Sequence, residues 1–559
     1  MDIKNKKSLY LLTLLLIGGF LMRVWGLWLM DLQGDAAHYA FRALGWFDSL
    51  LTQTGQTSPI NWFGFRPWWS YLSFHDHPAL GFAVMHIFFR IFGSRTFVVF
   101  LPFVFAGLGI SYILYRKLRT LTSEGTALLA LSIYSLASYA VWGSRTAYLE
   151  GIQVFFITLG FFAFLRYFET KRPNDASWWG IWTGLALMTK YTALFLPTGV
   201  VLYLVIWRHE WLMRKWHFWL GTINAVIILF PAILYNAMVF ASRGHFDAAL
   251  SSMLGQRPED YSYITNGASG LQLLGPWLNL GSNLSLPFFI LTLASLLWLF
   301  VTAVRNKDKS PLVRLLLTTI IALVLMFSVA GSSSRYLSIA MPFIAITIAL
   351  AVTAWWRALI AKPYLQKAVA LTIAIVFVLE LGYSINSNIL DKPIGVGGIA
   401  YAKGRVYRRG FQDVDNYIRN NIYPKMPPLR VVAEYQSPEF ATHDVILVDE
   451  RGDWFSGIWY YKRYLFYRLP LITIEDLFKL MKATSKEPTS AFDYLGNQGA
   501  RKIWFVRALP DAIVRDTDET YDTVISQLND QLAGAGIKPV IFYDYRGTPM
   551  FELYTFQLQ

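Results

Sequence analysis

Three short polar islands interrupt an otherwise apolar chain, and each carries side chains able to do acid–base or phosphate chemistry. The first, residues 34–39, brings Asp35 directly after the first long apolar run; the second is residues 75–78, and the third is residues 145–150. A carboxylate at the end of a membrane span costs free energy unless it pairs with a charged group. Charged groups at successive helix ends therefore indicate a site at the membrane–water boundary.

Asp35 has two interpretations that its position leaves open. A carboxylate there is able to take a proton from an attacking hydroxyl or amine, as a general base does. Asp is also a good N-cap for the amphipathic surface helix that the apolar spacing of residues 36–51 predicts. His38 and Tyr39, which follow it, are candidates for contacting an acceptor.

The second island is His75-Asp76-His77-Pro78, at the start of the short apolar run 79–93. Histidine beside aspartate suits pKa tuning, metal ligation or phosphate contact, and a helix N-terminus attracts phosphate. Pro78 suits a first helical turn, so a capped helix with incidental histidines explains the same residues. As a metal site the island is incomplete, because no further ligands follow at a fixed spacing.

Other charged residues stand near the ends of apolar runs. Arg145 and Glu150 flank a predicted external turn and could pair with each other. Lys190 lies inside an apolar stretch, so it must find a counter-charge, such as a lipid phosphate, or snorkel. Arg335, followed by Tyr336, could bind phosphate through its bidentate fork or anchor at the interface. The loop 241–284 adds polar candidates for covering a substrate, among them His245, Glu259 and Asp260.

The composition indicates a polytopic α-helical membrane protein. Of the 559 residues, 55% are hydrophobic and 15% are charged, against roughly 25% charged in soluble domains. The formal charge of +14 comes from short basic clusters between apolar runs, which is the positive-inside pattern and not a nucleic-acid surface. No Cys is present, so disulfides and thiolate metal sites are excluded.

About 11 spans fit the apolar pattern, with 177–207 counted as two short passes: 8–30, 95–115, 124–143, 151–168, 177–207, 217–240, 285–304, 312–331, 336–356 and 367–385. This number puts every basic cluster on the cytoplasmic side, with the N-terminus, and puts Asp35, Glu150 and Arg335 outside. We therefore expect a transmembrane domain, 1–385, with external loops 31–94 and 241–284. The remaining residues, 386–559, would form an extracytoplasmic domain.

That C-terminal domain is predicted to be a small α/β fold, because strand-like and helical patterns alternate in it. The strand candidates are 430–434, 445–448 and 502–507, and the helix candidates are 413–421, 474–483 and 518–533.

The ordered series of motifs resembles the GT-C class of polyprenyl-phosphate-sugar-dependent glycosyltransferases, most of all the branch with the protein O-mannosyltransferases and the lipid A aminoarabinose transferase. The resemblance covers about residues 8–385. Its motifs are Gly34-Asp35-Ala36-Ala37-His38-Tyr39, His77-Pro78-Ala79-Leu80, Leu187-Met188-Thr189-Lys190 after Gly184, and Arg335-Tyr336 before Pro342. Ala79, where the family has a second Pro, and a Glu at position 150 are departures.

The resemblance implies a sugar donor on undecaprenyl or dolichyl phosphate. An acceptor hydroxyl or amine on a glycan, lipid or protein would attack the anomeric carbon from outside, with inversion. Asp35 would be the general base, and Glu150 would orient the acceptor or hold a metal. The groups implied to neutralise the leaving phosphate are His77, Lys190, Arg335 and Tyr336. No nucleotide is required; a divalent metal ion stays open as a cofactor, with Asp35, His75, His77 and Glu150 as its ligands.

Two other classes of function compete with this one. A non-enzymatic lipid or polysaccharide transporter would show broken helices in matching halves or internal repeats, and the sequence shows neither. A structural scaffold with a partner-binding external domain would not explain acids gathered at outer helix ends.

Overall fold

A computed structural model describes residues 6–32, 34–45, 77–256, 274–305, 310–331, 335–390, 407–426, 444–452, 454–467, 469–484, 491–514, 519–534 and 536–558. The chain packs into two units, and each is described by itself. Unit 1 comprises Met1–Leu27, Phe63–Val84 and Phe100–Val406. Unit 2 comprises Trp28–Trp62, Met85–Val99 and Tyr407–Gln559.

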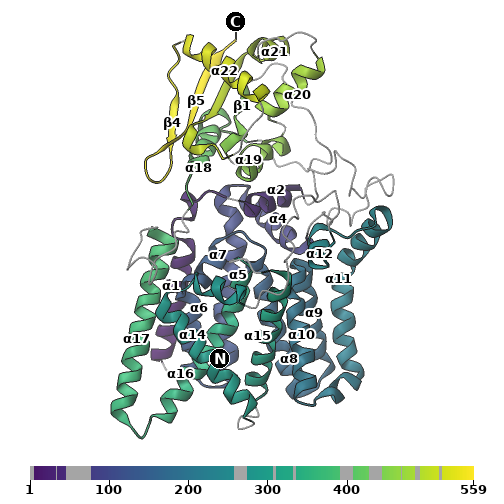
Figure 1. Ribbon diagram of the computed structural model, residues 1–559, viewed down its shortest axis with the longest axis vertical. Coiled ribbons are helices and arrows are strands. Elements are labelled where there is room, and N and C mark those ends of the chain that lie inside the picture. The colour runs from purple at the N-terminus through teal and green to yellow at the C-terminus, as the bar shows by residue number, and fades with distance from the viewer. Residues whose placement is uncertain are drawn as a thin grey trace. The chain divides into compact units, whose positions relative to one another are not determined.

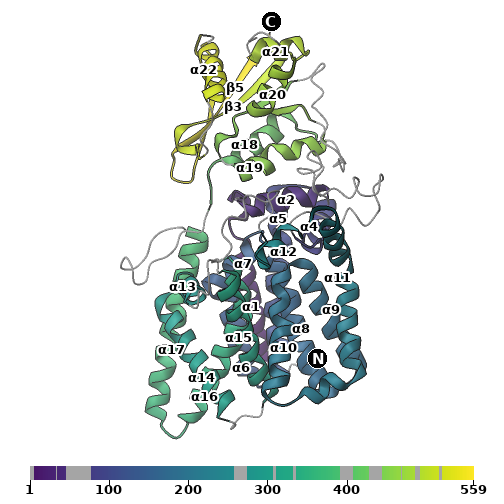
Figure 2. The ribbon, with the colours of Figure 1, turned by 45° about the vertical axis from the view of Figure 1, so that its right-hand side comes forward.

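Unit 1 is a bundle of helices that run side by side (Figures 1 and 2). Long apolar runs form helices in lipid because the backbone must satisfy its own polar groups. The elements are α1 (Lys6–Val24), α5 (Thr96–Leu121), α6 (Glu124–Leu136), α7 (Ser138–Arg145), α8 (Glu150–Thr170), α9 (Pro173–Thr189), η3 (Tyr191–Leu194), α10 (Phe195–Ile206), η4 (Glu210–Arg214), α11 (Trp216–Arg243), α12 (Ala248–Met253), α13 (Gly275–Gly281), α14 (Leu286–Val304), α15 (Pro311–Ala330), η6 (Tyr336–Ala340), α16 (Met341–Ala358), α17 (Pro363–Ile385) and η7 (Asn386–Leu390).

The described helices account for eight or nine passes through a membrane, against the about 11 expected. Among the described residues, eight helices are long and apolar enough to span, and the pair α6–α7, bent by 58°, makes a ninth. The 17-residue α9 packs against α8 and α11, and the short α10 packs against α15, so both lie within the bundle. The two short passes expected in 177–207 stay a prediction, because neither helix is among those that are long and apolar enough to span. The multi-pass helical class is confirmed.

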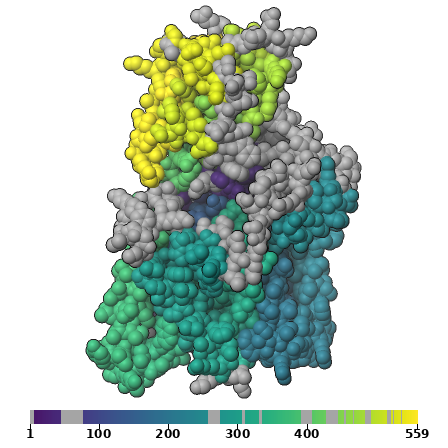
Figure 3. Space-filling view, viewed as in Figure 1, coloured from purple at the N-terminus to yellow at the C-terminus, as the bar shows by residue number. Residues whose placement is uncertain are grey.

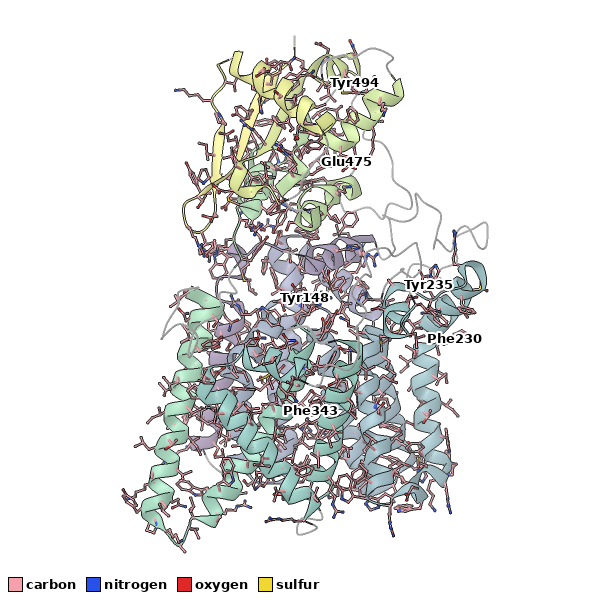
Figure 4. The ribbon with its side chains drawn as sticks, in the orientation of Figure 1. Tyr148, Phe230, Tyr235, Phe343, Glu475 and Tyr494 are labelled. Carbon is pink, nitrogen blue, oxygen red and sulfur yellow. The ribbon has the colours of Figure 1, made fainter. Side chains whose placement is uncertain are left out.

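Three helices form the periphery of the bundle. In the space-filling view, α17 (green) contributes surface toward the viewer (Figure 3), and α17, α11 and α14 are the three least buried of the candidate spans. Their exposed side chains are apolar, such as Phe230, which is 55% exposed on α11 (Figure 4). An apolar surface of this kind suits contact with lipid tails.

Small residues let α9 and α11 approach closely. A Cβ built at Gly180 would lie 1.8 Å from the carbonyl oxygen of Gly221, and one at Gly184 would lie 3.0 Å from Ala225. On each helix the two small residues are four apart, the spacing that allows backbones to touch in membranes. This contact holds α9, and the residue that follows it, against α11.

Opposite ends of the bundle carry different charges. The chain reverses from helix to helix, so the start of α8, the end of α9 and the start of α16 lie at one end, where Figure 4 also places Tyr148 and Tyr235. Phe343 lies deeper in the bundle (Figure 4). The other end carries a series of basic side chains: Lys6, Lys7, Arg116, Lys117, Arg119, Lys171, Arg172, Arg208, Arg214, Lys215, Arg305, Arg357, Lys362 and Lys367.

Unit 2 contains a mixed sheet whose described strands have the order β2-β1-β3-β5-β4. The strand β1 (Val445–Val448) pairs parallel with β2 (Leu471–Thr473) and β3 (Lys502–Ala508), whereas β5 (Pro549–Gln557) is antiparallel to β3 and β4 (Val540–Tyr543). The helices are α2 (Asp35–Gly45), α18 (Phe411–Tyr417), α19 (Trp454–Tyr460), α20 (Ile474–Thr484), α21 (Ala491–Asn497) and α22 (Glu519–Gly534). The small α/β fold is confirmed, and the candidate strand 430–434 lies outside the described residues.

Unit 2 does not begin at residue 386 as the sequence suggested, and it takes in part of the first external loop. The carboxylate of Asp31 accepts hydrogen bonds from the backbone amides of Arg409 (2.5 Å) and Gln412 (2.7 Å). The fully buried Arg463 pairs with Asp415 and donates to the carbonyl of Ser94 at 3.2 Å. Buried polar groups must be satisfied, and these partners come from distant parts of the chain.

The helix α2 is covered by protein. It packs against α19, and Phe41 and Leu44 are buried. Its second helical neighbour is α4 (Leu80–Phe92), which starts in unit 1; in the part within unit 2, His86 Nδ1 lies 2.6 Å from the carbonyl of Ala43. In its described part, Asp35–Gly45, the amphipathic helix expected at 36–51 therefore uses its apolar side for packing within the protein, and residues 46–51 lie outside the described ranges.

Glu450 is expected to make the stability of unit 2 depend on pH. Burial, reinforced by the nearby carboxyl of Glu475 on α20 (Figure 4), raises the pKa of Glu450 to about 8. A carboxyl with a raised pKa is most compatible with folding when protonated, so stability is complete below its unfolded pKa of about 4.3 and is lost as pH rises through 8. Thermal unfolding of the full chain between pH 5 and 9 should show this loss, and Glu450→Gln should remove most of it.

The control is Asp530→Asn, which changes an exposed acid of the same unit. It should leave the pH dependence of unfolding unchanged. A Glu450→Gln variant with the same pH dependence as the wild type would contradict the assignment.

Candidate active site

Glu150 and Lys190 form a buried ion pair at one end of the bundle. Glu150 is the first residue of α8, and Lys190 ends α9 in an extended conformation (φ −163°, ψ 138°). Lys190 Nζ donates to Glu150 Oε1 at 2.6 Å, and the residues are only 5% and 2% exposed. The snorkelling alternative for Lys190 is therefore wrong, because its counter-charge is a neighbouring acid.

Arg335 and Tyr336 join this pair from the start of η6. The ring of Tyr336 lies 4.5 Å from Lys190 Nζ, and its hydroxyl accepts a hydrogen bond from Arg335 Nη2 at 2.8 Å. The guanidinium of Arg335 is 5.6 Å from the ring centre of Tyr148, which precedes α8. Cations over aromatic faces are attracted by the ring quadrupole. Three segments far apart in the sequence thus converge on one cluster.

The cluster of Glu150, Lys190 and Arg335 has one more positive than negative charge. Both cations act on the Glu150 carboxylate. An ammonium has three donors, of which Glu150 takes one. Within the described part of the chain, Glu150 Oε2 is buried and accepts no hydrogen bond. A desolvated group of this kind, with excess cation and an Arg fork, suits an oxyanion such as phosphate.

Gln153 fixes the backbone at Lys190. Its amide nitrogen donates to the carbonyl of Lys190 at 2.6 Å, and its amide oxygen accepts from Thr192 at 3.1 Å. Gln153 lies three residues after Glu150 on α8, so both side chains are on one helix face. Residues on α8 therefore hold both the ammonium and the main chain of Lys190.

A second polar cluster adjoins the first through Tyr191. The Tyr191 hydroxyl donates to Asp247 Oδ2 at 2.6 Å, and Asn236 donates to the same oxygen at 2.8 Å. Asp247 also caps α12 by accepting from the amide of Leu250. Burial raises the pKa of Asp247 to about 6, and these hydrogen bonds together with the charge of His77 oppose that rise.

The sequence analysis missed Gln153, Tyr191 and Asn236 as site residues, and it had Asp247 only as one of the polar residues of the loop 241–284. Two local signals were available. Tyr191 directly follows Lys190, and Asn236 is a polar side chain inside the otherwise apolar α11. A polar group within a span usually marks a polar contact of the bundle interior. Gln153 had no local signal, because its partners Lys190 and Thr192 are brought to it only by the packing of α8 against α9.

Asp35 is the first residue of α2 in unit 2. Gly34, with φ +52°, precedes the helix, and its carbonyl accepts the amide of Ala37 at 3.1 Å. Asp35 therefore lies in the first turn, where a carboxylate favours the helix dipole, and is not the residue that precedes the helix. The hydroxyl of Tyr39 donates to its Oδ2 at 3.4 Å. The half-buried His38 is on the same helix.

The remaining candidates divide between structural contacts and residues outside the described ranges. Arg145 is buried and donates to the carbonyl of Met22 at 2.8 Å. The buried His245 lies 2.7 Å from the carbonyl of Phe246 through Nδ1. His75, Asp76, Glu259 and Asp260 lie outside the described residues.

The described residues do not favour a metal at Glu150. Among them, no three side chains of the metal-ligating types His, Asp and Glu form a group that could hold an ion. Glu150 is already engaged by Lys190 and faces a second cation, Arg335, so a metal ion would meet two like charges there. The chemistry considered below uses no step through a metal.

Comparison with known proteins adds a match to a family model over part of the chain. Residues 76–235, which include His77, Glu150 and Lys190, match the family model described as dolichyl-phosphate-mannose-protein mannosyltransferase. An uncharacterized protein of Aquifex aeolicus is 30% identical over 170 residues, which cover 29% of this chain and 33% of that protein. The chain thus spans about a third of the length of this curated relative.

Two solved structures share the fold over most of the chain. ArnT from Cupriavidus metallidurans, bound to undecaprenyl phosphate, matches with a TM-score of 0.57 and 12% identity, covering 98% of this chain and 97% of ArnT. The protein shares the overall fold of ArnT. The archaeal oligosaccharyltransferase AglB from Archaeoglobus fulgidus, in complex with an inhibitory peptide and a dolichol-phosphate, matches with a TM-score of 0.51 and 12% identity, covering 90% and 70%. The resemblance seen in the motifs is confirmed, and the match to ArnT extends the GT-C likeness beyond residues 8–385.

Proposed function

We propose that this GT-C protein transfers a sugar from a polyprenyl-phosphate donor to an acceptor hydroxyl or amine. The observation that carries the proposal is the cluster of the buried Glu150–Lys190 pair with the half-buried Arg335, whose excess positive charge suits a lipid phosphate. The donor class is supported by the names of its relatives: ArnT is bound to undecaprenyl phosphate, AglB to a dolichol-phosphate, and the matching family is named for dolichyl-phosphate-mannose.

The chemistry needs positive charge where the leaving group forms. When the bond between the anomeric carbon and the phosphate oxygen breaks, negative charge grows on that oxygen. Lys190 and Arg335 would offset it, and because they are already held in place by Glu150 and Tyr336, little reorganisation is needed during the reaction. His77 is the further candidate for contacting the phosphate.

Asp35 is proposed as the general base. The acceptor oxygen or nitrogen attacks the anomeric carbon on the face opposite the phosphate, and its proton passes to the Asp35 carboxylate. One displacement of this kind inverts the configuration at the anomeric carbon. Glu150 keeps Lys190 in position and is the group proposed to orient the acceptor.

The reaction is proposed to occur on the extracytoplasmic side. The end of the bundle opposite Glu150 and Lys190 carries the basic clusters at Arg116–Arg119 and Lys171–Arg172. Basic residues near span ends are retained on the cytoplasmic side. The N-terminus would then be cytoplasmic, and the residues after α17 would be outside.

Arg335→Gln is expected to weaken binding of polyprenyl phosphate about 10- to 100-fold, the range for losing a hydrogen bond between charged groups. Binding is to be measured by native mass spectrometry of the nanodisc-embedded protein titrated with undecaprenyl phosphate. Lys171→Gln, which removes a cation at the opposite end of α8, is the matched control and should bind as the wild type does. Wild-type protein that binds neither undecaprenyl nor dolichyl phosphate, and transfers no sugar from either, would overturn the proposal.

A further inference from the structure

The break between α6 and α7 is held by two buried charges. The helices bend by 58° at Ala137, which is extended (φ −61°, ψ 135°). A broken helix in a membrane leaves carbonyls on one side and amides on the other that need partners. Arg23 on α1 donates hydrogen bonds to the carbonyls, and Glu380 on α17 accepts hydrogen bonds from the amides.

Arg23 caps the C-terminal end of α6. Its side chain is fully buried, and it donates to the carbonyls of Ser135 and Tyr134, both at 2.9 Å. A guanidinium at this end also favours the helix dipole. Gly107 on α5 makes room for the Arg23 side chain. A Cβ at this position would lie 2.8 Å from Arg23 Nε and 2.4 Å from Ser144 Oγ.

Glu380 caps the N-terminal end of α7 and of a second helix. The carboxylate is 2% exposed, and its two oxygens accept the amides of Ser138 at 2.8 Å and of Ser285 at 2.9 Å. Ser138 starts α7, and Ser285 precedes α14. Carboxylates at helix N-termini are favoured by the dipole as well as by the hydrogen bonds.

The helix α7 connects this break to the candidate active site. Its last residue, Arg145, donates to the carbonyl of Met22, the residue before Arg23. A Cβ at Gly143 would lie 3.1 Å from Ser338 on η6, so α7 also packs closely against the segment that carries Tyr336. Tyr148 and Glu150 follow within a few residues.

We propose that Arg23 and Glu380 are positioning residues for sugar transfer, because they fix the break that sets α7 and, through it, Tyr148 and Glu150. The inference rests on the proposed function. In transporters, the ends of discontinuous helices bind the transported ion or substrate. Here Arg23 and Glu380 occupy the two helix ends at the break. The broken span therefore holds the residues of the site in fixed positions.

The test variant is Glu380→Gln, whose amide has one oxygen acceptor where the carboxylate has two. In hydrogen–deuterium exchange of the full chain in nanodiscs, amides of residues 138–149 should exchange about 10- to 100-fold faster than in the wild type. Sugar transfer should slow by a similar factor, with the melting temperature within a few degrees of the wild type. Glu380→Asp should restore part of both effects, because it keeps the charge.

Glu124→Gln is the matched control. Glu124 is an acid in the first turn of α6, at the end of the bundle away from the site. Its loss should change exchange only near residue 124 and leave transfer unchanged. Gly107→Ala, which presses on Arg23 and Ser144 without removing a charge, should give the same signature as Glu380→Gln.

The outcomes separate the two proposals. Unchanged exchange at 138–149 in Glu380→Gln and Gly107→Ala, or a loss of transfer that only follows the loss of folded protein, would overturn the positioning role. Wild-type protein that neither binds polyprenyl phosphate nor transfers sugar would overturn the proposed function instead, whatever the exchange data show.

Discussion

The Asp35→Asn variant is expected to transfer sugar at least about 1,000-fold more slowly than the wild type, within the range that general bases contribute. Asn has the shape of Asp but cannot take the acceptor's proton. It can still accept the hydrogen bond from Tyr39, so α2 should keep its first turn. Initial rates with a polyprenyl-phosphate sugar, together with donor binding by native mass spectrometry, make the test. The rate should fall while donor binding stays within about threefold of the wild type.

Asp31→Asn is the natural control, because Asp31 is a second carboxylate in the same segment with a structural role. It accepts the amides of Arg409 and Gln412, and burial raises its pKa to about 7. Its replacement should lower the melting temperature and leave the rate per folded molecule near that of the wild type. An Asp35→Asn variant that retains a rate within about threefold of the wild type would remove Asp35 as the base.

Hydropathy predicted the bundle well because each span is a local signal. The interruption at Lys190 predicts two helical segments in 177–207, and the structure has α9 and α10 on either side of that residue. The orientation of the spans that the basic clusters predict stays a prediction. The strands at 445–448 and 502–507 were also found, since each is a short apolar run bounded by turns.

Local sequence patterns did not reveal which charged side chains pair with each other. Glu150 could have paired with Arg145, five residues away, but it pairs with Lys190, forty positions later, because α8 and α9 are antiparallel. Arg23 and Glu380 lie within the first and last expected spans and were not among the sequence candidates, because their partners at the broken helix are distant in the sequence. The boundary of unit 2 was missed because Asp31 binds backbone amides far along the chain.

Lys190→Met and Glu150→Gln are both expected to lower the stability of the protein. Their effects on donor binding should be opposite. Each single change leaves one buried charge without its partner, which typically costs about 3–5 kcal/mol. Lys190→Met removes a cation from the phosphate site and should weaken polyprenyl-phosphate binding about 10- to 100-fold. Glu150→Gln removes the only anion among the three charged groups and should tighten that binding.

The double variant Lys190→Met/Glu150→Gln separates the two roles of the ion pair. With both charges gone, no buried charge of the pair is left alone, so the melting temperature should recover most of what the single variants lose. Donor binding should not recover, because the ammonium that meets the phosphate is still missing.

If binding recovered together with stability, Lys190 would serve only to hold Glu150, and the phosphate would have to be held by other groups. If Glu150→Gln weakened binding as much as Lys190→Met does, the excess positive charge would not be what attracts the donor. Opposite signs for the two single variants, with stability restored in the double, are what a phosphate site built on a compensated ion pair requires.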